Sequence, residues 1–342
     1  MTMKTRTTWI VAAMLGITAA ASAQVIDTSE TRVQTTLDPG FKRIGTIRPR
    51  AVGEIAGQNW SLGCETLDRG FASYDSYKDY LVPLGIRRIR LQGGWATTER
   101  EPGKYDWRWL DHIIDDVEVL KALFQQYAPQ IKLWQGEAGA QSEFCLGGAL
   151  CKYPWTELTQ AKWQTRRMLG DLGHDVESLV FSIADLDYNR WDGYRLGDID
   201  RYGLVKTDKQ YRLLKVKTAY YAVQNVVAIF DDSLVRAPDF PCEIQCPKAT
   251  ACYAYKNKQS GRQVLTFWDT SGVPSDRNDT VPATFTMTKG SFVEPVWVDL
   301  ITGGVFAIPA DRLVREGDRL ILKDIPVYDA PSLITDRRLV MP

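Results

Sequence analysis

The sequence predicts an α/β region followed by an all-β sandwich, and three observations carry this prediction. Strand-like and helix-like segments alternate four times between residues 60 and 230. Short apolar runs separated by turn signals then occupy residues 251–342, without helical periodicity. The length of 342 residues suits two domains, because a domain averages about 150 residues.

An export signal is expected at the amino terminus. Lys4 and Arg6 precede an apolar segment from Trp9 to Thr18, and small residues at 21–23 suit a signal peptidase. We therefore expect residues 1–23 to be a signal peptide and the mature chain to be secreted or periplasmic. No apolar run reaches the roughly 18 residues that cross a bilayer, so no membrane partner is expected. The balance of 42 basic and 42 acidic residues gives no reason to expect nucleic acid.

The first two βα units follow from apolar spacing. A short apolar run predicts a strand over 60–64, and helical spacing predicts a helix over 74–84 that Pro83 and Gly85 end. β-branched residues predict a strand over 86–91. The second helix is predicted over 107–127 because its apolar residues recur at helical intervals.

The third and fourth units follow the same pattern. A strand is expected over 131–134, followed by a helix from Thr156, a plausible N-cap, to Gly170. The last unit contains a strand over 179–183 and a long helix over 209–230. This repetition favours parallel pairing in an α/β barrel or in an open doubly wound sheet.

The sandwich is predicted from short strand-like runs between glycine-bearing turns. The runs are 264–268, 283–288, 295–300 and 319–322. We therefore assign residues 251–342 to a β-sandwich and the Cys- and Pro-rich stretch 236–250 to a linker.

The six cysteines become disulfide candidates in an exported protein. Cys145 and Cys151 flank a loop containing two glycines, and we expect them to be bonded. One bridge is expected among Cys242, Cys246 and Cys252, with the pairing left open. Zinc is a weaker interpretation of that cluster, because it has no Cys-x2-Cys pair and no nearby histidine.

Polar residues follow the predicted strands where an α/β site normally lies. Carboxylates and amides hydrogen-bond sugar hydroxyls, while tryptophan faces stack on sugar rings, so a neutral polyhydroxylated ligand is expected. Eight of the 11 tryptophans lie between residues 60 and 191, although those at helical positions belong to the core. The candidate ligand-binding residues are Glu65, Gln92, Trp95, Gln135, Asp185 and Asp187. Arg90 and Glu137 are the candidate catalytic residues.

Four segments together carry a family resemblance. Residues 86–95 (IRRIRLQGGW), continued by 101–111, resemble the second strand and helix of clan A glycoside hydrolases. Residues 133–137 (LWQGE) resemble their seventh strand, residues 180–187 their eighth, and residues 203–221 the helix that closes their barrel. The resemblance implies a (β/α)8 barrel with an appended β-sandwich. It also implies that Glu137 is the catalytic nucleophile and that Arg90 holds it ionised.

The sequence departs from the family pattern in two ways. The family's acid/base glutamate follows an asparagine, and no Asn-Glu pair occurs in this chain, so Glu65 or Asp185 would have to replace it. Residues 59–230 contain four βα units, where a full barrel of eight needs about 250 residues. The expected fold is therefore an incomplete (β/α)8-type barrel over residues 24–235, including an N-terminal arm, followed by the sandwich.

Three hypotheses follow. The chain is a retaining glycoside hydrolase acting on an oligo- or polysaccharide, a non-catalytic carbohydrate-binding protein, or an internally deleted, inactive chain. No cofactor or metal is expected. An apolar interior face left in water would cost on the order of 10 kcal/mol. An isolated chain is therefore expected to be marginally stable, to aggregate, or to pair with a second copy into one complete barrel.

Overall fold

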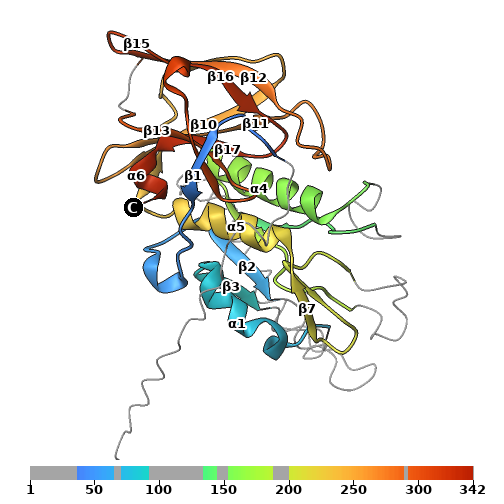
Figure 1. Ribbon diagram of the computed structural model, residues 1–342. Coiled ribbons are helices and arrows are strands. Elements are labelled where there is room, and N and C mark those ends of the chain that lie inside the picture. The colour runs from blue at the N-terminus through green and yellow to red at the C-terminus, as the bar shows by residue number, and fades with distance from the viewer. Residues whose placement is uncertain are drawn as a thin grey trace, which may run out of the picture.

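The computed structural model describes residues 37–64, 71–91, 134–144, 153–187, 200–288 and 292–341. These residues form a parallel sheet, a layer of two helices and a β-sandwich, arranged from the lower to the upper part of Figure 1. The helices α4 (Glu157–Gly173) and α5 (Thr218–Ile229) contact each other in the middle layer. The predicted helix over 107–127 and the signal peptide lie outside the described residues.

The parallel sheet follows the predicted strands closely. In the described residues its order is β3-β2-β5-β4, with β2 (Trp60–Cys64) and β5 (Glu177–Val180) in the centre. β3 (Arg88–Leu91) and β4 (Trp134–Ala138) form its two edges. The first strand is confirmed as predicted, whereas β3 begins two residues later and β5 two residues earlier than the sequence patterns suggested. β4 continues beyond residue 134, so Gln135 and Glu137 lie within a strand rather than after it.

The face of this sheet turned away from the helices carries small, charged and apolar side chains. Ser61 is opposite Arg88 and Gly63 is opposite Arg90 in the parallel register, so these four residues share one face. Arg88 forms an ion pair with Glu177 of β5, with 2.8 Å between Nη1 and Oε2. Leu179 of β5, opposite Ser61 and fully buried, shares this face, so the face combines an apolar side chain with small and charged ones. The expectation of a wholly apolar interior face does not hold at Arg88 and Arg90. Leu62, opposite Ile89 and Val180, belongs to the other face.

Two helices confirm their sequence signals. α1 (Tyr74–Leu84) ends at Gly85, which adopts a left-handed conformation with φ 85°. A Cβ at this position would also lie 2.6 Å from the carbonyl oxygen of Arg50, so glycine is required there. α4 begins after Thr156, whose side chain accepts a hydrogen bond from the Thr159 amide. No helix in the described ranges is long and apolar enough to cross a bilayer.

The predicted helix over 209–230 is wrong for residues 209–217. β6 (Val205–Thr207) and β7 (Leu213–Val216) form an antiparallel hairpin there, and α5 begins only at Thr218. Asp208 organises the turn, because its Oδ1 accepts hydrogen bonds from the amides of Gln210 and Arg212, both at 2.9 Å. Local hydrogen bonding by this aspartate competes with helix formation and redirects the chain.

The sandwich contains two antiparallel sheets. The seven-stranded sheet has the order β1-β14-β13-β17-β11-β10-β8, and the four-stranded sheet has the order β15-β16-β12-β9. The strands of the larger sheet are β1 (Lys42–Thr46), β8 (Leu234–Arg236), β10 (Thr250–Asn257), β11 (Gln263–Asp269), β13 (Pro295–Asp299), β14 (Gly304–Ala307) and β17 (Ser332–Asp336). Those of the smaller sheet are β9 (Cys242–Gln245), β12 (Val281–Met287), β15 (Leu313–Glu316) and β16 (Arg319–Val327). The short helices η2 (Val52–Glu54), η5 (Ala310–Arg312) and α6 (Arg337–Val340) complete the described elements.

The boundaries of the sandwich differ from those predicted. Residues 236–250 are not a linker, because they contain β9 and reach the first residue of β10. The N-terminal arm supplies β1, which pairs with β14 at an edge of the larger sheet. The sandwich is therefore assembled from both ends of the chain. A pairing between such distant segments leaves no local sequence signal.

The two parts share one hydrophobic core rather than two. A continuous cluster of buried side chains runs from Trp60 of β2 through Phe230 to Tyr255 of β10. Lys162 of α4 crosses the same boundary and is fully buried. Its Nζ donates to Asp329 Oδ1 at 2.6 Å and to the carbonyl oxygen of Arg277 at 2.7 Å. The sandwich and the parallel sheet consequently support each other through α4 and α5.

Candidate active site

The candidate site lies at the carboxyl edge of the parallel sheet. Parallel strands present their carboxyl ends on the same side, where α/β proteins place ligands. Arg90 and Glu137 are the second-last residues of β3 and β4, and Asp185 and Asp187 follow β5. The structure thus gathers four predicted residues at one edge. Glu65, Gln92 and Trp95 lie outside the described residues, and only the backbone of Gln135 is described.

Glu137 projects from an irregularity in β4. Gln135 pairs with Ser178 and Ala138 with Val180, so two residues of β4, Gly136 and Glu137, face one residue of β5. Such a bulge bends a strand and redirects its side chains, and bulges are common beside active sites. The Glu137 side chain is 63% exposed. It is therefore a carboxylate fixed to a strand yet open to solvent.

Arg90 binds Glu137 from the opposite edge of the sheet. The distance from Arg90 Nη2 to Glu137 Oε1 is 3.0 Å, and Arg90 also donates to the carbonyl oxygen of Gly136. β3 and β4 are separated by β2 and β5, which would place them about 14 Å apart in a flat sheet at about 4.8 Å per strand. A side chain spans that separation only if the sheet curves toward this face. The ion pair is thus a consequence of curvature.

Asp185 performs a different task from the one predicted. Its side chain has no exposed surface, and Oδ1 accepts hydrogen bonds from Lys217 Nζ at 2.6 Å and from the Gly203 amide at 3.0 Å. Lys217 is equally buried and also donates to Ser142 Oγ at 2.9 Å. Burial raises the pKa of Asp185 and lowers the pKa of Lys217, while their mutual attraction opposes both shifts.

This buried pair holds together three segments around the site. Ser142 follows β4, Asp185 follows β5, and Lys217 precedes α5. Asp185 is therefore a supporting residue in this structure, not an exposed ligand-binding residue. Asp187 is likewise buried, at 6% exposure, and its amide donates to the Phe71 carbonyl oxygen at 3.1 Å.

Asp200 is a candidate that sequence reasoning missed. Its amide and carbonyl both bond to Leu186 in an isolated antiparallel bridge, which places it beside the segment that follows β5. Burial raises the pKa of Asp200 to about 6, the nearby charge of Asp185 adds to the shift, and the Gln141 side chain opposes it. No motif surrounds Asp200. Asp200 becomes a candidate only because the fold pairs it with Leu186, which a sequence pattern does not show.

A second charged group lies beside these residues. Glu143 Oε1 is 2.6 Å from Arg201 Nε and 3.3 Å from Lys206 Nζ. Phe144, the next residue, is 71% exposed, which is unusual for a large aromatic side chain. The edge thus presents an acidic residue, basic residues and an aromatic face. Within the described ranges no group of three or more side chains is arranged to hold a metal ion.

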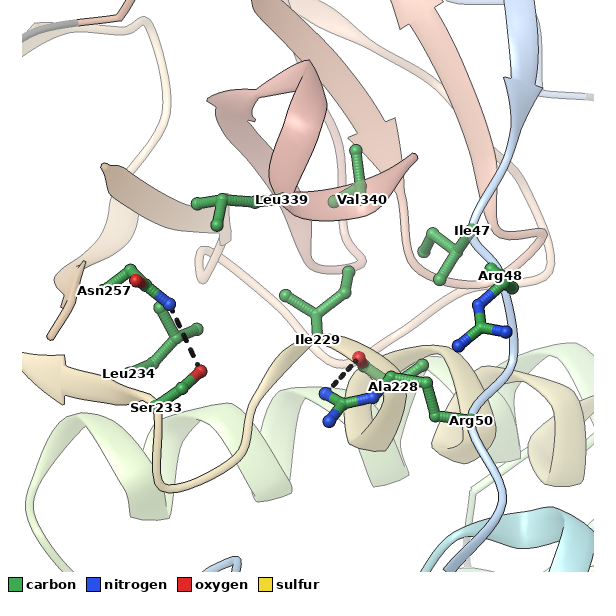
Figure 2. A pocket seen from close by; sticks show the side chains of 10 residues that line it. All are labelled: Ile47, Arg48, Arg50, Ala228, Ile229, Ser233, Leu234, Asn257, Leu339 and Val340. Carbon is green, nitrogen blue, oxygen red and sulfur yellow. Dashed lines mark hydrogen bonds between the residues drawn. The ribbon is translucent and has the colours of Figure 1, made fainter. Parts of the chain in front are cut away.

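The two larger of three cavities found among the described residues lie away from this edge, at the junction of the helices and the sandwich. One, of about 160 Å³, is enclosed by the end of α5, β8, α6 and the residues after β1, as Figure 2 shows. In it Arg50 donates to the Ala228 carbonyl oxygen at 3.2 Å and Asn257 to Ser233 Oγ at 3.3 Å (Figure 2). The other, of about 260 Å³, is lined by Gln58, Trp60 and Tyr255 among others. Neither includes a predicted site residue.

Comparisons with known proteins give limited likeness. No protein-family model and no curated protein matches the chain. It is similar to a solved structure of the glycoside hydrolase family 30 subfamily 8 xylanase from Clostridium acetobutylicum. The identity is 9% and the TM-score 0.33, over 60% of this chain and 42% of that one. It is also similar to a "putative beta-galactosidase" from Bacteroides fragilis, with 12% identity and a TM-score of 0.23, over 61% of this chain and 29% of that one. The chain therefore spans less than half the length of either structure.

Proposed function

We propose that the chain is an exported glycosidase-type protein that cleaves O-glycosidic bonds with Glu137 as nucleophile. The observation that carries the proposal is the exposed Glu137 carboxylate, fixed in a bulge and held by Arg90 across a curved sheet. A nucleophilic carboxylate has to be accessible and oriented, and this arrangement provides both. The substrate class is an oligo- or polysaccharide, for which the exposed ring of Phe144 offers an apolar face.

The sheet order supports an incomplete (β/α)8-type barrel. The family resemblance assigns residues 86–95, which contain β3, to the second barrel strand and residues 133–137, which overlap β4, to the seventh. It assigns residues 180–187, which begin at the last residue of β5, to the eighth, and we take β5 as that strand and β2 as the first. A closed barrel places its eighth strand beside its first, so these four would lie in the order second, first, eighth, seventh. The observed order β3-β2-β5-β4 is the same. The curvature that brings Arg90 to Glu137 also agrees with a barrel segment.

Asp200 is our candidate for the acid that the sequence did not supply. A retaining mechanism needs a carboxyl that is still protonated near the working pH, so that it donates to the leaving oxygen. Asp200 meets this requirement because its pKa is raised to about 6 and it lies next to the segment after β5. The nucleophile is then the exposed carboxylate paired with Arg90, and the acid is the buried carboxyl whose raised pKa lets it keep its proton. This division matches the different roles of the two carboxyls.

Hydrolysis of a panel of p-nitrophenyl glycosides tests the proposal. Glu137→Gln keeps the side-chain shape but removes the nucleophile, so turnover should fall by several orders of magnitude. Glu177→Gln is the matched control, because Glu177 is also paired with an arginine of β3 on the same face. Glu177 is the first residue of β5, so it lies at the amino end of the sheet, away from the carboxyl edge that holds the candidate site. This variant should retain most of the wild-type rate. Equal loss in both variants would show a structural effect and contradict the assignment.

Substrates with different leaving groups distinguish the role of the acid from that of the nucleophile. Asp200→Asn should slow hydrolysis of alkyl glycosides far more than hydrolysis of dinitrophenyl glycosides, because a good leaving group needs little protonation. The same loss for both substrates would remove Asp200 from the mechanism. A non-catalytic carbohydrate-binding protein remains the second candidate, favoured by the exposed Phe144 beside the charged group around Glu143. Calorimetric binding of oligosaccharides without any turnover would identify that function instead.

A further inference from the structure

The structure discriminates among three cysteines whose pairing the sequence leaves open. Cys242 is the first residue of β9 in the four-stranded sheet, whereas Cys252 lies in β10 of the seven-stranded sheet. Cys246 follows the end of β9, in the connection between them. The first two cysteines therefore belong to opposite sheets of the sandwich, although only ten positions separate them in the chain.

The strand register directs Cys252 into the sandwich. Cys252 is directly opposite Phe267 on β11, and opposed residues of antiparallel strands project to the same face. Phe267 is fully buried, and its ring contacts that of Phe285 on β12, with centroids 4.7 Å apart. Because β12 belongs to the other sheet, this face of β10 is the one that meets the four-stranded sheet.

The register of β9 directs Cys242 toward the same interior. Ile244 is opposite Phe285 and Cys242 is opposite Met287, which is 1% exposed. Residues two apart in a strand share a face, so Cys242 and Ile244 both project inward, while Glu243 between them is exposed. Cys242, Cys246 and Cys252 are free thiols in this structure, so the bridge expected among them is not formed in it. Cys242 and Cys252 are partly buried and, like Cys246, pack against the same hydrophobic cluster.

The two side chains meet. The Cys252 thiol is within hydrogen-bonding reach of the Cys242 side chain, and this contact together with burial raises the pKa of Cys252. Two sulfur atoms in contact across a sheet interface need little backbone movement to reach disulfide geometry. A high thiol pKa disfavours spontaneous reaction of Cys252, so an oxidant has to engage its partner first.

We propose that Cys242 and Cys252 form a disulfide that joins the two sheets of the sandwich. The oxidant is a disulfide compound, such as oxidised glutathione or a protein thiol oxidase. The Cys242 thiolate attacks one sulfur of that disulfide and releases one thiolate, giving a mixed disulfide. The Cys252 thiolate then attacks the Cys242 sulfur and expels the second thiol. Two protons leave the protein, its two sulfurs are oxidised, and the oxidant is reduced to two thiols.

The bond would secure an edge strand. In the described residues β9 is at the end of the four-stranded sheet and pairs with β12 alone. Edge strands detach and recruit other strands more readily than central ones. A covalent link from Cys242 to β10 would hold this four-residue strand in place. The proposal goes beyond glycoside chemistry and does not depend on it.

Peptide mapping tests the pairing, because the sequence separates the three cysteines. Trypsin and an endoproteinase that cleaves after glutamate release residues 237–243, 244–248 and 249–256, each with one of these cysteines. The full-length protein is reduced, treated with oxidised glutathione, alkylated and digested without reductant. We expect 237–243 to be linked to 249–256, with Cys246 alkylated. A link that includes 244–248, or free thiols at both Cys242 and Cys252, would overturn the proposal.

Thermal unfolding tests the role of the bond and includes a matched control. Reduction should lower the Tm of the oxidised wild type by about 5 °C or more, since a short closed loop still restricts the unfolded chain. Cys246→Ala should keep this response, whereas Cys242→Ala should lose it and leave Cys252 free in the peptide map. A wild-type Tm that does not change on reduction would contradict a stabilising link. Glycoside turnover is recorded in parallel, so a failure of the proposed activity is distinguishable from a failure of the disulfide.

Discussion

Replacing Lys217 by methionine breaks a fully buried ion pair while conserving most of the side-chain volume. Neither Lys217 nor Asp185 has exposed side-chain surface, and Nζ to Oδ1 is 2.6 Å. The variant removes the strongest hydrogen-bond donor of the Asp185 carboxylate and leaves Ser142 Oγ without its donor. The Gly203 amide at 3.0 Å and Arg201 at 3.4 Å remain, but they do not replace a buried ammonium group.

The expected cost follows from burial. Removing one partner of a buried pair costs about 3–5 kcal/mol, because the remaining charge has no compensation. At 2–4 °C per kcal/mol for a large domain, the Tm should fall by roughly 10 °C at pH 7. The sign of the pH dependence is fixed as well. Without Lys217 the pKa of Asp185 rises further, because its buried charge has lost its partner. The destabilisation is therefore present at a pH where Asp185 would be ionised, and it fades as acid protonates Asp185. The loss should therefore be smaller near pH 4.

Urea unfolding of three variants measures this coupling. Lys217→Met should lose the most stability, and Lys217→Met combined with Asp185→Asn should recover part of it, because no unpaired charge remains. Asp185→Asn alone also tests whether Asp185 binds ligand, as the sequence suggested. Equal stability of the wild type and Lys217→Met would refute the reasoning. So would an Asp185→Asn protein of wild-type stability that had lost only sugar affinity.

Two further predictions concern Asp200 and the start of α4. Burial raises the pKa of Asp200 from 3.8 to about 6. The folded state therefore keeps this proton to a higher pH than the unfolded state does. The stability that this group contributes is lost as the pH rises from 3.8 to about 6. The free energy of unfolding of Asp200→Asn should exceed that of the wild type by roughly 1–3 kcal/mol at pH 8 and by nothing near pH 3.5, measured by urea unfolding at both pH values. The same difference in unfolding free energy at both pH values would exclude the raised pKa. Thr156→Ala removes the acceptor of the Thr159 amide, 3.2 Å away, and should cost about 1 kcal/mol in the same assay, whereas Thr156→Ser should cost little; an unchanged alanine variant would mean that the cap does not stabilise α4.

Local signals predicted the local elements well. The cap at Thr156 marked the start of α4, Gly85 marked the end of α1, and the apolar run over 60–64 marked β2. The ion pair of Arg90 and Glu137 also agrees with the sequence expectation that these residues meet. These features depend on short-range patterns or on strand ends. A sequence displays such patterns directly.

Features that depend on the chain path were missed. The pairing of β1 with β14 joins segments more than 250 residues apart, and Asp200 reaches the site only by pairing with Leu186. Asp208 organises the turn of a hairpin over residues 205–216, although the sequence suggested a helix from residue 209 onward. Arg88 and Arg90 place charge on a face that the sequence suggested to be apolar, although Leu179 also lies on it. Pairing of two chains there stays a prediction. The predicted bond between Cys145 and Cys151 lies outside the described residues.

Covalent trapping of the nucleophile tests the central claim most directly. A 2-deoxy-2-fluoro glycoside with a good leaving group slows the second step of a retaining reaction, so the glycosyl-enzyme intermediate accumulates. Peptide mass spectrometry of the treated protein should locate one fluorosugar on Glu137, and Glu137→Gln should take up none. A fluorosugar on another carboxylate would contradict the role of Glu137. The absence of any adduct on a protein that hydrolyses the parent glycoside would contradict the covalent mechanism.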